Sequence, residues 1–229
     1  MNKNINKISI VNILILSILL FSGKWLASFI LFNGENHILK IIEDSFEDSY
    51  MYFHYVLSLS EFDFSNIYSE AHENYKLKIA PIGTLITHSL FFKFIGSYSF
   101  ILMEFISIFL FILIFYLILR EFNISNELSI LLSLIFFCLP LLIQKLTFIN
   151  IVEIQTFSNN FYNLRFPRPL ISNLYLFGFI LILIKNLKSD SFEKKYLITY
   201  SILLALSLTS FFFIFILQSI SLSIFLLFK

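Results

Sequence analysis

Cysteine, tryptophan, proline and glycine are all scarce in this chain, which has 1, 1, 4 and 5 of them among 229 residues. The single cysteine, Cys138, lies inside an apolar run, so no disulfide can form within the chain, and the redox compartment stays open. The sequence has no Gly-rich phosphate loop, nucleophile elbow or Walker motif. Few Gly and Pro beside abundant Phe and Ile fit the nucleotide bias of an AT-rich genome, which carries no functional information.

Charge is also scarce, at 14% of residues with a net charge of +1. So small a net charge argues against electrostatic binding of nucleic acid, and we expect no nucleic-acid partner. Hydrophobic residues make up 58% of the chain, and the charged ones cluster between long apolar runs. A soluble domain of this length has no interior for so much apolar surface, so lipid must solvate part of it. We predict an all-α, polytopic transmembrane helix bundle.

The apolar runs predict a single transmembrane domain over residues 1–229. Its expected spans are 8–32, 100–119, 126–146, 169–187 and 196–216, with a partial span at 217–229. The first run lacks a small-x-small cleavage site, which indicates an uncleaved span. The last apolar stretch, residues 196–228, would be about 50 Å long as one helix, too long for one span and too short for two. We therefore expect a sequence cut at its C-terminus inside a further span.

Basic residues set the expected orientation. If the spans alternate, one side of the membrane receives Lys3, Lys7, Arg120, Lys185, Lys188, Lys194 and Lys195. The positive-inside rule makes that side the cytoplasm, so the N-terminus is expected there and the loop 33–99 outside.

The outer loop 33–99 carries four carboxylates within six residues, at Glu43, Asp44, Glu47 and Asp48. They precede an aromatic stretch with helical spacing, which predicts an interfacial helix. One interpretation is a solvated acidic helix start; the other is a carboxylate that takes a proton from an acceptor hydroxyl. The stretch 81–96 begins with Pro and ends with Gly, and at about 22 Å it predicts a second interfacial helix, too short to span.

The second outer segment, residues 147–169, ends with Arg165-Phe166-Pro167-Arg168-Pro169. Two arginines held between prolines at the mouth of a span suit the binding of phosphate or carboxylate. The alternative is a pair of arginines that contact lipid headgroups beside a helix.

Three further sets of residues give weaker signals. Glu104 lies within a turn of the outer end of its span, so it either reaches the interface or has a buried role. The histidines at 54, 72 and 88 show no metal-ligand spacing, and we expect no zinc site. Glu61 and Asp63 would suit a divalent cation, although two acids one residue apart are common by chance.

The order of these features resembles a known family. An outer loop after the first span carries Glu47-Asp48-Ser49-Tyr50-Met51-Tyr52, and Pro81-Ile82-Gly83-Thr84-Leu85-Ile86 then leads to Phe94-Ile95-Gly96 and another span. This pattern, over residues 8–145, is similar to the N-terminal part of the GT-C superfamily of multispanning glycosyltransferases, such as protein O-mannosyltransferases and lipid A aminoarabinose transferases. One departure is Glu104, near the position where many relatives carry a basic residue. The C-terminal half expected of the family is also missing.

The resemblance implies an extracytoplasmic active site in which Glu47 and Asp48 supply the catalytic carboxylate and the donor is a polyprenyl-phosphate sugar. We therefore expect a glycosyltransferase of a bacterial inner membrane, with a lipid, glycan or protein as acceptor. Arg165 and Arg168 would bind the lipid phosphate, and substrate binding would also involve Tyr50 and Tyr52, which shape the sugar pocket. Two other classes stay open: a transporter or flippase, and a non-catalytic membrane assembly subunit.

Overall fold

The computed structural model of this chain describes residues 7–31, 49–63, 81–145, 170–189 and 194–228. These residues form eight α-helices and no β-strand, so the predicted all-α class is confirmed for them. The helices are α1 (Lys7–Leu31), α3 (Ser49–Ser60), α4 (Ile82–Ile95), α5 (Tyr98–Glu121), α6 (Asn126–Lys145), α8 (Leu170–Leu187), α9 (Lys194–Leu208) and α10 (Phe212–Phe228).

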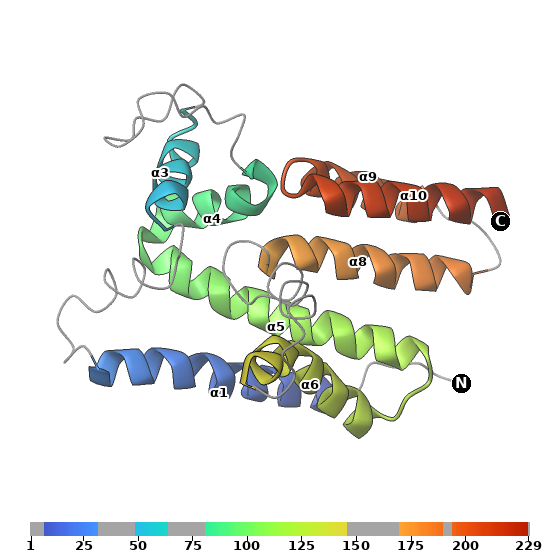
Figure 1. Ribbon diagram of the computed structural model, residues 1–229, viewed down its shortest axis with the longest axis horizontal. Helices are drawn as coiled ribbons and strands as arrows, with labels where there is room; N and C mark the ends of the chain where they lie inside the picture. The colour runs from blue at the N-terminus through green and yellow to red at the C-terminus, as the bar shows by residue number, and fades with distance from the viewer. Residues whose placement is uncertain (1–6, 32–48, 64–80, 146–169, 190–193, 229) are drawn as a thin grey trace.

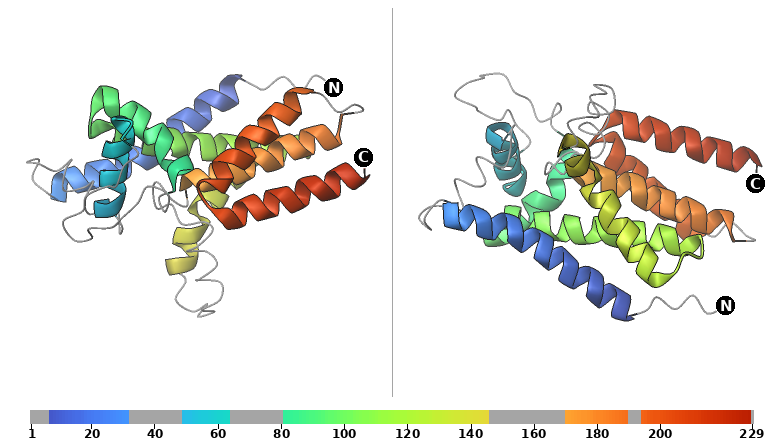
Figure 2. Two further views of the ribbon diagram at one scale, coloured as in Figure 1. Left: turned by 90° about the horizontal axis from the view of Figure 1, so that it is seen from above. Right: turned by 60° about the horizontal axis from the view of Figure 1, so that its bottom comes forward.

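Most of the helices run along the long axis of the molecule and alternate in direction (Figures 1 and 2). In chain order these are α1, α5, α6, α8, α9 and α10, although α6 is inclined and its last turns point away from the other helices (Figure 2). Helix α3 lies across this axis, and α4 lies beside it near the beginning of α5 (Figure 1). We call this the α3–α4 end, and we call the opposite end, where α5 turns into α6, the turn end.

Helix α5 is the centre of the arrangement, because it contacts α1, α4, α6 and α8. Its contact with α1 includes an edge-to-face pair of Phe21 and Phe105, with ring centroids 5.4 Å apart. The helical hairpin α9–α10 packs on the far side of α8. Packing on several sides explains why residues all along α5, from Ser99 to Tyr116, are buried.

The connection between α5 and α6 is a tight turn fixed by three local features. Asn123 has a left-handed backbone with φ of 61°, a conformation that asparagine tolerates better than most residues. Ser125 Oγ accepts a hydrogen bond from the Leu128 N–H at 3.3 Å, which caps the start of α6. Tyr116 Oη donates to Asn126 Oδ1 at 3.0 Å and so ties the last turns of α5 to the first turn of α6.

The last apolar stretch differs in detail from the sequence-based expectation. The chain breaks between Leu208 and Phe212, whereas the predicted boundary fell after residue 216. Thr209 Oγ1 bonds back to the Ala205 carbonyl at 2.9 Å, and Ser210 Oγ bonds to the Leu206 carbonyl at 2.5 Å. Such bonds compete with the helical ladder and favour a bend at this point.

Two helices are long and apolar enough to cross a membrane, judged by length and composition over the described residues: α5, with mean hydropathy 2.8, and α8, with 1.8. Shorter apolar stretches of 10–17 residues lie in α1, α4, α6, α9 and α10. Each predicted span therefore overlaps a helix, while the two predicted interfacial segments correspond to α3 and α4.

Candidate functional site

The six residues that the sequence analysis selected as site residues cannot be placed. Glu47, Asp48, Arg165 and Arg168 lie outside the described residues. Tyr50 and Tyr52 belong to the first turn of α3, where only the backbone is described. Along the chain, α3 begins directly after Asp48 and α8 begins two residues after Arg168. Both α3 and the start of α8 lie at the α3–α4 end (Figure 1).

Helix α4 is held at that end by contacts of its first turn with α8 and α9. Tyr175 Oη, on α8, donates to the Gly83 carbonyl oxygen at 2.6 Å. The Gly83 N–H donates to the Thr209 carbonyl oxygen at 3.3 Å, just beyond the end of α9. On the next helix, Gln218 Nε2 donates to the Tyr175 carbonyl oxygen at 3.1 Å. Helices α4, α8, α9 and α10 therefore meet at one hydrogen-bonded junction.

Glycine at position 83 is required by this junction. A Cβ atom there would lie 2.6 Å from Thr209 Oγ1 and closer still to Ser210 Oγ and the Leu206 carbonyl oxygen. Real Cβ atoms essentially never come within 3.0 Å of such neighbours. The absence of a side chain thus allows the start of α4 to touch the backbone at the end of α9.

Buried polar side chains gather around the same end of the bundle. Helix α4 contributes Thr84, His88 and Ser89, the first two turns of α5 contribute Ser99 and Glu104, the first turn of α8 contributes Ser172 and Asn173, and α3 contributes Tyr55. Polar side chains are expensive to bury between apolar helices and often mark a functional site there. This set is the candidate site within the described residues.

His88 and Glu104 are the two titratable groups of special interest in this set. The His88 ring packs against the Phe100 ring, with centroids 4.0 Å apart, and Glu104 follows Phe100 by one helical turn on α5. Burial lowers the pKa of His88 from 6.5 to about 3, because the charged imidazolium is poorly solvated there. His88 is therefore neutral at pH 7 and can both donate and accept hydrogen bonds.

The helical register places Glu104 at the level of the first turn of α8. The rings of Phe111 on α5 and Phe177 on α8 are in contact, with centroids 5.6 Å apart, and the two helices run in the same direction. Glu104 and Leu170 each precede these rings by seven residues, or about 10 Å of helix rise. Glu104, whose side chain is almost fully buried, thus lies level with the N-terminus of α8, where the helix dipole favours a negative charge.

Below this polar set the interior becomes aromatic. Phe115 on α5 contacts Phe136 on α6 and Phe177 on α8, with ring centroids 4.0 and 4.5 Å apart. Phe111 adds contacts to Phe137 and Phe177 at 5.7 and 5.6 Å. We call Phe111, Phe115, Phe136, Phe137 and Phe177 the aromatic core. Such close ring packing separates the polar set from the turn end.

The turn end carries the described basic residues that the sequence analysis assigned to one side; Lys3 lies outside the described residues. Lys7, Arg120, Lys185, Lys188 and Lys194 all lie at or near helix ends there (Figure 1). Lys188 Nζ is 3.4 Å from Glu121 Oε2 and lies 5.5 Å from the centre of the Phe122 ring. The Arg120 guanidinium donates to the Ile124 carbonyl oxygen within the turn. These five basic residues and the polar set thus lie at opposite ends.

Of the remaining residues singled out from the sequence, His72 and the side chain of His54 lie outside the described part of the structure, and two acids lie at the surface. Glu61 and Asp63 are exposed just after α3, where the Ser58 hydroxyl donates to the Asp63 carbonyl oxygen at 2.6 Å. Within the described ranges, no group of three or more His, Cys, Asp or Glu side chains is arranged to hold a metal ion. The divalent cation considered for Glu61 and Asp63 therefore gains no third ligand from a His, Cys, Asp or Glu side chain among the described residues.

Sequence reasoning missed the junction at Gly83 and the burial of His88. Glu104 was recognisable, because it is the only charged residue in the apolar stretch 98–119. Nothing in the local pattern distinguished His88 from a surface histidine, and Tyr175 is 92 residues from its partner Gly83.

Comparisons of this chain with protein-family models, with curated proteins and with solved structures find no match.

Proposed function

We propose that this chain is a polytopic membrane protein, with α1, α5, α6, α8, α9 and α10 crossing the bilayer. Large apolar side chains are exposed on every one of these helices, while many serines and the residues Glu104, Asn173 and Gln218 are buried. Water-soluble proteins rarely expose contiguous apolar patches larger than a few hundred Å², so lipid is the natural solvent for this surface. The alternating helix directions support the same topology (Figure 2).

In this proposal the turn end faces the cytoplasm and the N-terminus lies on that side. The supporting observation is that Lys7, Arg120, Lys185, Lys188 and Lys194 share the turn end, which is the asymmetry that the positive-inside rule uses. The α3–α4 end then faces outward from a bacterial inner membrane. Helices α3 and α4 lie at the outer interface.

We further propose that the protein is a glycosyltransferase whose site opens to the outer face. The observation that carries this step is where the buried histidine and the buried acid lie: His88 and Glu104 are both at the α3–α4 end, and the aromatic core fills the middle of the bundle. The buried polar residues elsewhere in the described helices are serines, Asn186 and Gln218. An enzyme that meets a lipid-linked donor and its acceptor on one side needs only one open end. A transporter or flippase needs polar residues or broken helices at mid-membrane depth, where α5 and α8 pack Phe111, Phe115 and Phe177 against one another.

The proposed reaction uses the residues that the family resemblance assigns. Asp48 or Glu47 accepts the proton of an acceptor hydroxyl on a lipid, glycan or protein. The hydroxyl oxygen forms a bond to the anomeric carbon of the sugar, and the bond from that carbon to the phosphate oxygen breaks. The polyprenyl phosphate leaves with the electron pair, stabilised by Arg165 and Arg168. Tyr50 and Tyr52 shape the sugar pocket.

A transfer assay in membranes tests the proposed chemistry. Radiolabelled polyprenyl-phosphate hexose serves as the donor, and label in glycan, lipid and protein fractions is counted for wild type, Asp48→Asn and Glu47→Gln. We expect at least one variant to lose about 10²-fold or more of the activity, the size typical of a lost general base. The exposed acids Glu61 and Asp63 provide matched controls as Glu61→Gln and Asp63→Asn, which should retain it.

The same assay distinguishes the alternatives. Unchanged turnover in both Asp48→Asn and Glu47→Gln would refute the mechanism. Movement of the labelled donor across reconstituted vesicles without sugar transfer would identify a flippase. An assembly subunit would be identified by two results together. Alanine at positions 47 and 48 would be tolerated, and a co-purifying protein would be lost when other surface residues are changed.

A further inference from the structure

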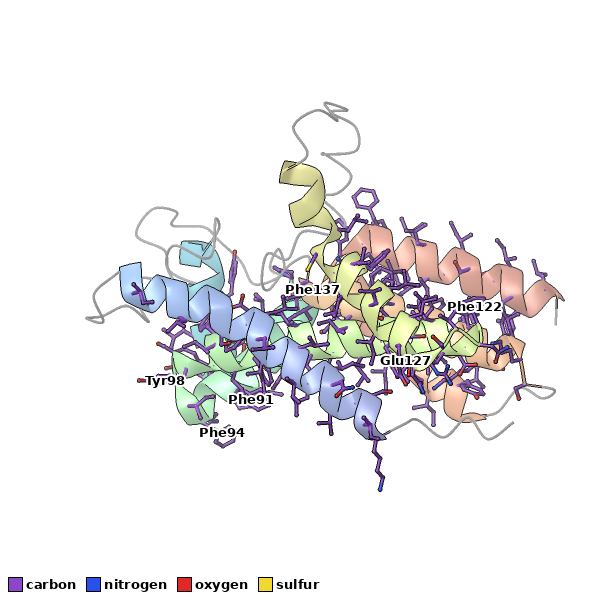
Figure 3. All side chains as sticks on the ribbon, turned by 90° about the horizontal axis from the view of Figure 1, so that it is seen from below. Phe91, Phe94, Tyr98, Phe122, Glu127 and Phe137 are labelled. Carbon is purple, nitrogen blue, oxygen red and sulfur yellow. The ribbon has the colours of Figure 1, made fainter. Side chains whose placement is uncertain are left out.

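Exposed aromatic side chains gather where α4 meets α5. Phe94 and Tyr98 are 83% and 60% exposed, and Phe91 is also exposed (Figure 3). Lys93, in the last turns of α4, is exposed as well, and its Nζ atom lies 4.8 Å from the centre of the exposed Phe62 ring. We call Phe62, Phe91, Lys93, Phe94 and Tyr98 the α4 patch. It combines exposed rings with one ammonium group.

A smaller surface of the same composition lies at the turn end. Phe122 is 61% exposed, and Lys188 Nζ lies 5.5 Å from the centre of its ring. Figure 3 shows Phe122 at the opposite end of α5 from Phe91, Phe94 and Tyr98. We call Phe122 and Lys188 the turn patch. Each end of α5 thus has exposed aromatic surface next to a lysine.

The spacing of the two patches is fixed by α5. Tyr98 begins this helix and Phe122 follows its last residue, so 24 residues separate them, which corresponds to about 36 Å of helix rise. The hydrocarbon core of a bilayer is about 30 Å thick, and the headgroup regions extend the total to about 40–45 Å. Each patch therefore falls a few ångströms outside the hydrocarbon core if α5 stands near the membrane normal.

The segment between the patches is suited to hydrocarbon. From residue 99 to 119 the only charged side chain is Glu104, which is buried against the other helices. The exposed positions between the ends include Leu102 and Leu110. Leu110 is 12 residues from both Tyr98 and Phe122, so it marks the midpoint of the helix.

We propose that the α4 patch and the turn patch dock onto the two phospholipid interfaces of one bilayer and fix the depth of the bundle. Aromatic rings with a polar neighbour favour the headgroup level, and a lysine there places its ammonium group among the phosphates. A protein partner would require no such spacing between two separate patches. The proposal rests on the membrane insertion proposed above, and it is independent of the transferase chemistry.

Tryptophan fluorescence in vesicles tests the assignment. The one natural tryptophan is first removed by Trp25→Phe, and Tyr98→Trp, Leu110→Trp and Phe122→Trp are then made singly. Each full-length variant is reconstituted into phosphatidylcholine vesicles with bromine atoms either near the headgroup or near the chain ends. Phe94→Trp, at a still more exposed site, replaces Tyr98→Trp if that variant does not fold.

We expect tryptophan at positions 98 and 122 to be quenched about twofold more by shallow than by deep bromine, and tryptophan at 110 to show the reverse order. Stronger quenching by deep bromine at 98 or 122 would overturn the inference. So would quenching at 110 alone, because protein rather than lipid would then cover the patches. An absence of quenching at every position would overturn the proposed membrane insertion as well. Loss of sugar transfer with the expected quenching would refute only the proposed transferase activity and leave the membrane docking intact.

Discussion

The junction at Gly83 gives the sharpest prediction about stability. In Gly83→Ala, the new Cβ would start 2.6 Å from Thr209 Oγ1 and closer to the Leu206 carbonyl oxygen, so it must move beyond 3.0 Å. Because one of the obstructing atoms is backbone, α4 has to shift away from the end of α9. Overpacking of this kind costs about 1–3 kcal/mol. A shift also weakens the Tyr175–Gly83 hydrogen bond, worth about 0.5–1.5 kcal/mol.

A second glycine provides the matched control. A Cβ at Gly178, in the middle of α8, would meet only Leu203 Cδ2 at 3.9 Å, an ordinary contact. Both substitutions add the same methyl group, so the gain in helix propensity of up to about 1 kcal/mol is common to both. We therefore expect Gly83→Ala to be about 1.5–4.5 kcal/mol less stable than Gly178→Ala, by addition of the two penalties above.

Unfolding in mixed micelles by a denaturing detergent, followed by far-UV circular dichroism, measures this difference. Tyr175→Phe in each glycine background shows whether the hydrogen bond is part of the loss, because its effect should shrink once α4 has shifted. Equal stability of Gly83→Ala and Gly178→Ala would refute the close approach of α4 and α9.

Three further predictions concern single interactions. Because burial lowers the pKa of His88 from 6.5 to about 3, the unfolded chain binds a proton between these pH values that the folded chain does not bind. The free energy of unfolding should therefore be highest above pH 6.5 and fall towards pH 3, with a slope approaching 1.4 kcal/mol per pH unit. His88→Gln should reduce the difference in the free energy of unfolding between pH 7.5 and pH 5. Phe115→Ala should cost about 3–5 kcal/mol by opening a cavity in the aromatic core, whereas Phe94→Ala should change stability in detergent by less than about 0.5 kcal/mol. Lys188→Gln should lower the free energy of unfolding by less than about 1 kcal/mol in the same assay, because solvent screens the 3.4 Å ion pair of Lys188 with Glu121. A larger loss would contradict this screening.

Much of the helix layout could be read from local pattern. The start of α6 coincides with the predicted boundary at residue 126, and α8 begins at Leu170, one residue from the predicted start. Uncharged runs separated by short charged segments are a property of neighbouring residues, so composition alone reveals them. The break before α10 was placed eight residues too late, because back-bonding by Thr209 and Ser210 has no hydropathy signal.

The candidate site depends much more on contacts between distant residues. Glu104 was recognisable in the sequence as the only charged residue in its apolar stretch. That it lies level with the first turn of α8 follows only from the contact between the rings of Phe111 and Phe177. His88 became a candidate only through its burial against Phe100. The proposed roles of Asp48 and Arg168 stay predictions from sequence, since both residues lie outside the described part of the chain.

The amino-acid sequence by itself determined that the chain is helical, where its apolar stretches lie and which basic residues share one end, because each of these depends on residue composition and short-range periodicity. Only the tertiary structure decided that Gly83 meets Tyr175 and Thr209, that His88 and Glu104 are buried at one end, and that phenylalanines fill the middle. These features join residues about a hundred positions apart, and such contacts arise from the packing of whole helices, which no local pattern encodes.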